Sequence, residues 1–225
     1  PTRRSSDLEG QIIDGRLRSI ESLVHVYREA AYEALLDTRF QADELEHQRH
    51  AVTDSGVFHT RSDDGRAASF YANSTPLAQQ DHAKVMRLSQ IDPLMRSIQQ
   101  ANPLVAALYF NTWDSYNRIY PWFDTPAQYP HDMVIPDYNF YYLADAKHNP
   151  ERKVMWTEVY LDPAGLGWMM SAIAPVYRGD FLEGVVGLDV TVGQLLGKIA
   201  ELNVPWQGYA MLVSQDHDIM ALPKA

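Results

Sequence analysis

The chain of 225 residues is 46% hydrophobic and 11% aromatic, enough to bury a core, and its formal net charge is −10. This acidic balance repels phosphate backbones and argues against nucleic-acid binding. The sequence has no cysteine, which excludes disulfides, thiolate metal sites and a cysteine nucleophile, and no run approaches the roughly 18 apolar residues of a membrane-spanning helix.

The beginning of the chain predicts a short tail followed by a long helix. Residues 1–8 resemble the translation of a sequencing-library adapter, so we expect an adapter-derived or disordered tail there. A helix is expected over residues 9–50, because Gly10 to Gln48 lacks proline and carries a heptad-like stripe of apolar or small residues. The stripe is Ile13, Leu17, Ile20, Val24, Tyr27, Ala31 and Ala34. It favours equally a helix packed on its own domain and one that forms a parallel homodimer.

A hairpin and a second helix are expected next. Gly56–Thr60 and Ala67–Tyr71 flank Asp63-Asp64-Gly65, a turn sequence whose residue types tolerate positive φ. A helix then runs from Leu77 to about Ala101, where Asn102-Pro103 ends it. It should pack by one apolar face, formed by Val85, Leu88, Ile91, Leu94, Met95 and Ile98.

After Pro103 the sequence becomes rich in strand-forming residues. Leu104–Asn111 and Tyr116–Phe123 are expected to pair across a turn, and Pro121 limits the second strand. Three later segments separated by short turns predict an antiparallel meander. These segments are Trp156–Leu161, Trp168–Tyr177 and Leu182–Val190.

The end of the chain should hold one more helix and one more strand. Thr191 can cap a helix that runs to about Leu202, and Tyr209–Ser214 is expected to begin a strand whose partners are missing. A long helix, a second helix and an antiparallel sheet together indicate the α+β class.

Three blocks of this region occur in a characteristic order. They read Trp-Thr-Glu-Val-Tyr-Leu-Asp (156–162), Ser-Ala-Ile-Ala-Pro-Val-Tyr (171–177) and Gly-Val-Val-Gly-Leu-Asp-Val (184–190). The ordered series resembles the signature of the Cache superfamily. The pair Gly184 and Gly187 is not a dinucleotide-binding fingerprint, because the three-glycine spacing and the strand-to-helix crossover are missing.

The resemblance implies the membrane-distal module of a double Cache domain over residues 51–206, with a PAS-like antiparallel sheet whose concave face holds a ligand. Residues 207–225 would then be the first strand of a truncated membrane-proximal module. The family also implies the periplasmic or extracellular part of an inner-membrane bacterial receptor. Such a receptor is of the histidine kinase, chemoreceptor or diguanylate cyclase type, and helices outside this chain would anchor it in the membrane.

The resemblance also implies candidate ligand-binding residues. The amino-acid-binding branch of the family has an Arg-x-Trp-Tyr block, which here reads Asn139-Phe140-Tyr141-Tyr142. Its Tyr-x-Asp block and the aspartate at the end of the Gly-Val-Val-Gly strand correspond to Tyr160, Asp162 and Asp189. Asparagine replaces the arginine that would bind a ligand carboxylate, so an amine or another small polar metabolite is the expected ligand. Weaker candidates for the pocket wall are Tyr120 and Trp122.

Structural interpretations of the same residues stay open. Asp162 precedes Pro163 in a turn, Asp189 ends a strand ahead of a helix, and Tyr141 and Tyr142 can be core aromatics. No motif specifies catalysis, a metal site or a cofactor, so a non-enzymatic small-molecule sensor is predicted. The main alternative is a ligand-free structural or partner-binding module whose pocket is filled by its own tyrosines. A hydrolase with an aspartate pair is the third hypothesis.

Overall fold

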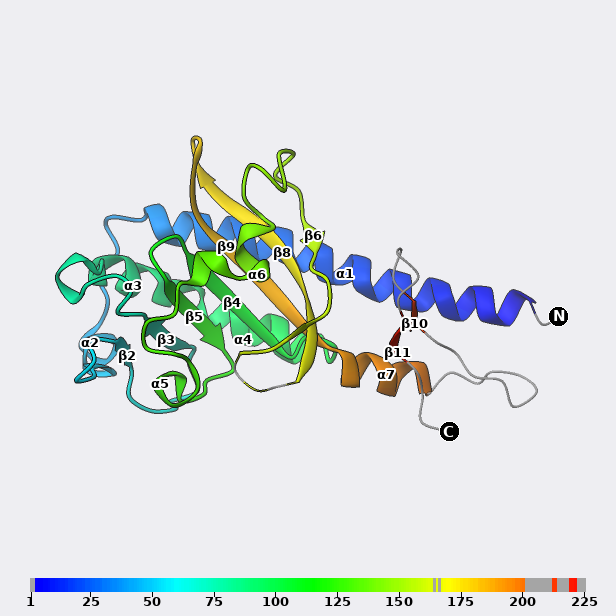
Figure 1. Cartoon of the computed structure of the whole chain (residues 1–225), viewed down its shortest axis with the longest axis horizontal. Helices are drawn as coiled ribbons and strands as arrows, with labels where there is room; N and C mark the ends of the chain where they lie inside the picture. The colour runs from blue at the N-terminus through cyan, green and yellow to red at the C-terminus, as the bar shows by residue number, and fades with distance from the viewer. Residues whose placement is uncertain (1–2, 164, 166, 201–211, 214–218, 222–225) are drawn as a thin grey trace.

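In the computed structural model a long helix lies along one face of an antiparallel sheet (Figure 1). The structure describes residues 3–163, 165, 167–200, 212–213 and 219–221. Within them the main sheet has nine strands in the order β1-β2-β3-β5-β4-β9-β8-β6, and β7 also pairs with β8. Its strands are β1 (His50–Val52), β2 (Phe58–Thr60), β3 (Ala68–Tyr71), β4 (Ala107–Thr112), β5 (Tyr116–Tyr120), β6 (Met155–Trp156), β7 (Tyr160–Leu161), β8 (Trp168–Arg178) and β9 (Phe181–Thr191). This architecture confirms the predicted α+β class.

The helices cover both faces of the sheet. The first face is covered by α1 and the helical region between β3 and β4, and the second by short helices between β5 and β6. They are α1 (Arg3–Leu36), α2 (Glu44–Gln48), η1 (Leu77–Gln79), α3 (His82–Leu88), η2 (Ser89–Ile91), α4 (Asp92–Ala101), α5 (Thr125–Gln128), η3 (Ile135–Asp137), α6 (Asn139–Tyr142) and α7 (Val192–Ala200). The two faces hold separate hydrophobic clusters, because side chains alternate along each strand.

The first helix differs from the prediction at both ends. It includes residues 3–8, where a tail was expected, and it ends at Leu36 instead of continuing to residue 50. A new helix, α2, starts where the Asp43 carboxylate accepts a hydrogen bond from the Glu46 backbone N–H at 2.7 Å. This N-cap satisfies a donor that a continuous helix would bond internally. Residues from His50 then pair with β2, which a helix to residue 50 would prevent.

The apolar stripe of α1 packs on its own domain. Ile20, Val24, Tyr27 and Ala31 are fully buried, and the helix contacts β8 and β9. Of the two arrangements that the stripe favours equally, Ile20 and Val24 therefore follow the packing of the helix on its own domain, because these side chains are covered within the chain. Leu17 is half-buried and remains a candidate for self-association.

The other predicted elements are mostly present. The hairpin forms between β2 and β3, and β6, β7, β8 and β9 form the antiparallel meander. The expected strand Trp156–Leu161 is two short strands, and the expected helix 77–101 is interrupted. Pro93 lies in the first turn of α4, where its missing N–H is tolerated, so the α-helical bonding restarts there.

The last predicted helix and strand are also found. The Gln194 backbone N–H donates to Thr191 Oγ1 at 3.2 Å at the start of α7, which confirms the predicted cap. The predicted strand at Tyr209–Ser214 is represented by β10 (Leu212–Val213), and the rest of it lies outside the described residues. The expectation that it lacks partners is wrong, because β10 pairs with β11 (Ile219–Ala221).

Candidate functional site

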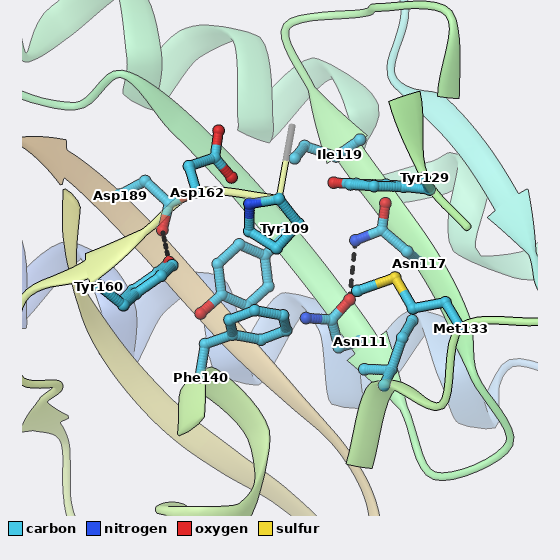
Figure 2. A pocket seen from close by; sticks show the side chains of 12 residues that line it. Tyr109, Asn111, Asn117, Ile119, Tyr129, Met133, Phe140, Tyr160, Asp162 and Asp189 are labelled. Carbon is cyan, nitrogen blue, oxygen red and sulfur yellow. Dashed lines mark hydrogen bonds between the residues drawn. The ribbon is translucent and has the colours of Figure 1, made fainter. Parts of the chain in front are cut away.

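A pocket lies on the face of the sheet opposite α1, over the middle of β4, β5 and β9 (Figure 2). It encloses about 360 Å³, including its open mouth. Strand residues form its floor, and residues between β5 and β8 form its walls. The lining consists of Tyr109, Asn111, Asn117, Ile119, Tyr129, Met133, Ile135, Phe140, Tyr160, Asp162, Pro163 and Asp189.

The glycines of the Gly-Val-Val-Gly block give room to aromatic rings of the neighbouring strand. Gly187 is paired with Tyr109 in the β4–β9 register, and a Cβ at Gly187 would collide with the Tyr109 ring and hydroxyl. A Cβ at Gly184 would likewise collide with the Phe110 ring and the Asn111 carbonyl. Gly187 therefore lets Tyr109 lie flat over β9 as part of the pocket floor.

Asp189 is the most deeply buried carboxylate of the pocket. It pairs with Ala107 of β4 and Ser171 of β8, and only 4% of its surface is exposed. Its Oδ1 accepts a hydrogen bond from Ser171 Oγ at 2.5 Å and one from the Tyr160 hydroxyl at 3.4 Å. Burial raises the pKa of Asp189 to about 7, although these two hydrogen bonds oppose the shift, and the charge of Asp162 raises it further.

Tyr160 and Asp162 reach the same end of the pocket from β7 and the turn after it. The Tyr160 hydroxyl lies 2.7 Å from Ser171 Oγ, and burial together with the charge of Asp189 holds the pKa of Tyr160 well above its ordinary value. The turn is closed by a hydrogen bond from the Asp162 N–H to the Gly167 carbonyl at 3.0 Å. This end of the pocket therefore combines two carboxylates with a hydroxyl that stays protonated.

An aromatic group lines the region beside these carboxylates. The Phe140 ring lies 5.8 Å from the Tyr109 ring and 5.7 Å from the Tyr160 ring, measured between centroids. Figure 2 shows Tyr109 of the floor and Phe140 of the wall next to Tyr160. A cation bound by Asp189 would lie close to these π faces.

Two asparagines form the other polar part of the pocket. Asn111 of β4 and Asn117 of β5 are directly opposite each other, and Asn117 Nδ2 donates to Asn111 Oδ1 at 2.7 Å. Both are almost fully buried, with 2% and 4% of their surface exposed. The pocket therefore has a carboxylate end and an amide end.

The structure places three of the eight predicted site residues in the pocket lining, namely Tyr160, Asp162 and Asp189. The block Asn139–Tyr142 forms the short helix α6, and the side chain that lines the pocket from it is Phe140. Tyr141 is buried in the neighbouring hydrophobic cluster, and Tyr142 is exposed and lies 5.4 Å from the His148 ring. Asn139 is half-buried and does not line the pocket.

The two weaker candidates also lie outside the lining. Tyr120 packs against the hydrophobic cluster on the α1 face, whereas its neighbour Ile119 faces the pocket. This follows from the alternation of side chains along β5. Trp122 lies after the strand and donates from Nε1 to Thr60 Oγ1 at 3.2 Å.

The remaining lining residues were not predicted from the sequence. They are Tyr109, Asn111, Asn117, Ile119, Tyr129, Met133, Ile135, Phe140 and Pro163. The alternation of residues 107, 109 and 111 on β4 and of residues 117 and 119 on β5 is a signal that places these two sets on single faces. It does not tell which face is the pocket side.

Among the residues that the structure describes, no group of three or more histidines, aspartates or glutamates is arranged to hold a metal ion. None of the helices described combines the length and apolar character that crossing a membrane requires.

Comparisons with known proteins identify solved structures only, since no family model and no curated protein matches the chain. The ligand-binding domain of the Campylobacter jejuni chemoreceptor Tlp3, in complex with L-norvaline, is similar over 98% of this chain and 68% of that chain, with 13% identity and a TM-score of 0.56. This likeness shows that the chain shares the fold of a chemoreceptor ligand-binding domain, in keeping with the fold that the sequence resemblance implies.

Two Pseudomonas structures match over shorter parts of the chain. The ligand-binding domain of Pseudomonas fluorescens CtaA with L-valine is 23% identical over 56% of this chain, with a TM-score of 0.44. That of Pseudomonas aeruginosa PctB with L-Arg is 24% identical over 67% of this chain, with a TM-score of 0.49. The chain spans 52% and 58% of the length of these two domains.

Proposed function

We propose that this chain is the ligand-sensing part of a bacterial transmembrane receptor and that it binds a small amine in the pocket of Figure 2. The observation that carries the proposal is the buried carboxylate of Asp189, which lies near the end of β9 inside a pocket on a Cache-type sheet. The fold supports a sensor, since the Tlp3 domain of the same fold was solved in complex with an amino acid.

The charge of the pocket supports an amine over an amino acid. Among the lining residues that the structure describes, two are aspartates and none is lysine, arginine or histidine. Arg118, on the strand that carries Asn117, faces the opposite side of the sheet and bonds both Asp92 oxygens at 2.6 Å. A ligand carboxylate entering this pocket would therefore lose hydration without gaining a cationic partner.

An ammonium group, in contrast, would find an anionic partner and aromatic faces in this pocket. A charge-assisted hydrogen bond to Asp189 contributes about 1.5–3 kcal/mol. A cation over the faces of Tyr109 and Phe140 adds about 0.5–2 kcal/mol. Together these two contacts contribute about 2–5 kcal/mol, which is on the order of millimolar binding, and burial of the ligand's apolar part adds to it.

The receptor context is part of the same proposal. We place the chain in the periplasm or outside the cell, as the sensing part of an inner-membrane protein whose membrane helices and output domain lie outside this sequence. Because α1 packs along β8 and β9, a ligand that changes the position of these strands can bias the helix between two states. Binding, and not catalysis, is the proposed role.

The alternative, a structural module without a ligand, is less well supported. It predicts that Tyr141 and Tyr142 fill the pocket, but neither side chain lines it. The space is instead bordered by polar groups at both ends, which suits an occupant with polar ends.

Calorimetry with L-norvaline and its decarboxylated counterpart, butylamine, tests the proposal. Butylamine should bind more tightly, and Asp189→Ala should lower its affinity by more than about 1.5 kcal/mol, roughly tenfold. Asp180→Ala is the matched control, because Asp180 is fully exposed in the β8–β9 turn and its loss changes the net charge equally. Tighter binding of norvaline than of butylamine would refute the charge argument.

A further inference from the structure

We infer that Asn111 and Asn117 form a second subsite that binds a neutral carboxamide at the far end of an extended amine. The ligand class is thus an ω-amino amide, with its ammonium at Asp189 and its amide at the asparagine pair. This inference rests on the proposed function and specifies the ligand of the same pocket.

The asparagine pair has hydrogen-bonding capacity that the protein does not use. Asn117 Oδ1 is buried and has no hydrogen-bond partner among the described residues, while its Nδ2 is bonded to Asn111. Figure 2 shows this oxygen pointing away from Asn111, on the side of Tyr129. Buried polar atoms are nearly always paired, so an acceptor left open in the lining of a pocket indicates a donor on the ligand.

The pair is complementary to another amide. When two side-chain amides share one hydrogen bond, the oxygen of one and the amino group of the other take no part in it. This holds also if both amides are flipped. Here these two groups are Asn117 Oδ1 and Asn111 Nδ2. A carboxamide supplies both a donor and an acceptor, whereas a carboxylate supplies only acceptors and an ammonium only donors.

The charges around the subsite exclude an ionised group there. The nearest guanidinium in sequence, that of Arg118, is fully buried on the other face and bonded to Asp92. A carboxylate at the asparagine pair would be buried without a cation, and an ammonium would be buried without an anion. A neutral polar group avoids both penalties.

The strand register sets the length of the ligand. Asp189 is opposite Ala107, and Asn117 is opposite Asn111, so the two polar ends are four residues apart along β4. At about 3.3 Å per residue this separation is about 13 Å along the strand, and β9 lies about 4.8 Å from β4, so Asp189 and Asn111 are about 14 Å apart and a hydrogen bond at each end leaves about 8 Å. Tyr109 lies between them and would contact the methylene chain. A five-carbon ω-amino amide has about this length.

The test compares four probes by calorimetry on the intact chain: 5-aminopentanamide, 5-aminopentanoate, 1,5-diaminopentane and pentylamine. All four keep the ammonium and differ in the far end. We expect 5-aminopentanamide to bind at least about tenfold more tightly than each of the others. Asn117→Leu should remove the advantage of 5-aminopentanamide over pentylamine.

Asn73→Leu is the matched control, since Asn73 bonds the Ser55 carbonyl at an exposed site and should leave the ranking unaltered. If pentylamine binds in an Asp189-dependent way but the amide binds no more tightly, the asparagine subsite is overturned while the proposed amine sensor stands. If Asn117→Leu weakens all probes equally, the subsite is also overturned. If none of the four binds, both proposals fail.

Discussion

The buried charge of Asp189 should lower the stability of the unliganded protein, and Asp189→Asn should raise it. The pKa of Asp189 is about 7 in the folded chain, against an ordinary value of 3.8. Between these values the folded state holds a proton that the unfolded state has lost. Stability therefore falls as the pH rises from about 4 to about 7, and it is constant above that.

The magnitude follows from the size of this shift. Roughly three pKa units correspond to about 4 kcal/mol of unfolding free energy. The wild type loses this free energy between about pH 4 and about pH 7, and the variant does not. The amide of the variant can still accept the hydrogen bonds from Ser171 and Tyr160 and is nearly isosteric with a protonated carboxyl. The two proteins should thus be equally stable near pH 4, and the variant should be more stable by up to about 4 kcal/mol near pH 8.

Urea denaturation of both proteins across this pH range measures the difference. The thermal midpoint of the variant should also rise near pH 8, by about 2–4 °C for each kcal/mol. Asp180→Asn, at an exposed site, should be as stable as the wild type across the same pH range. A difference that stays constant with pH, or a variant that is less stable near pH 8, would refute the reasoning that burial holds the pKa of Asp189 high.

Three other outcomes are expected. Arg118→Leu leaves the buried Asp92 carboxylate without its bidentate partner, and denaturation should show a loss of about 3–5 kcal/mol; a loss below about 1 kcal/mol would contradict this. Gly187→Ala pushes a methyl group into Tyr109, so it should cost about 1–3 kcal/mol and weaken butylamine binding, whereas wild-type affinity would show that the ring moves freely. Leu17→Glu should reduce any self-association seen by sedimentation without changing the thermal midpoint, and an unchanged association would place the contact elsewhere.

The sequence by itself determined the local elements of this protein and the carboxylate end of its pocket. Period-two patterns, turn residues and the Thr191 cap depend on neighbours in the chain, and they predicted β8, β9 and the start of α7. The Cache-like blocks also led to Tyr160, Asp162 and Asp189, all of which line the pocket. These residues lie within strands or directly after them, so the pattern of the strand determines where they point.

Only the tertiary structure decided the extent of α1 and the amide end of the pocket. Helix propensity alone favours continuation past Leu36, whereas in the structure the helix ends there and Arg87 Nε of α3 donates to the carbonyl of Leu35 at 3.0 Å. Asn111 and Asn117 meet because β4 and β5 pair in one particular register, and a shift by one residue would turn one of them to the α1 face. Register and the rotation of short helices such as α6 depend on contacts between distant segments, which local patterns do not contain.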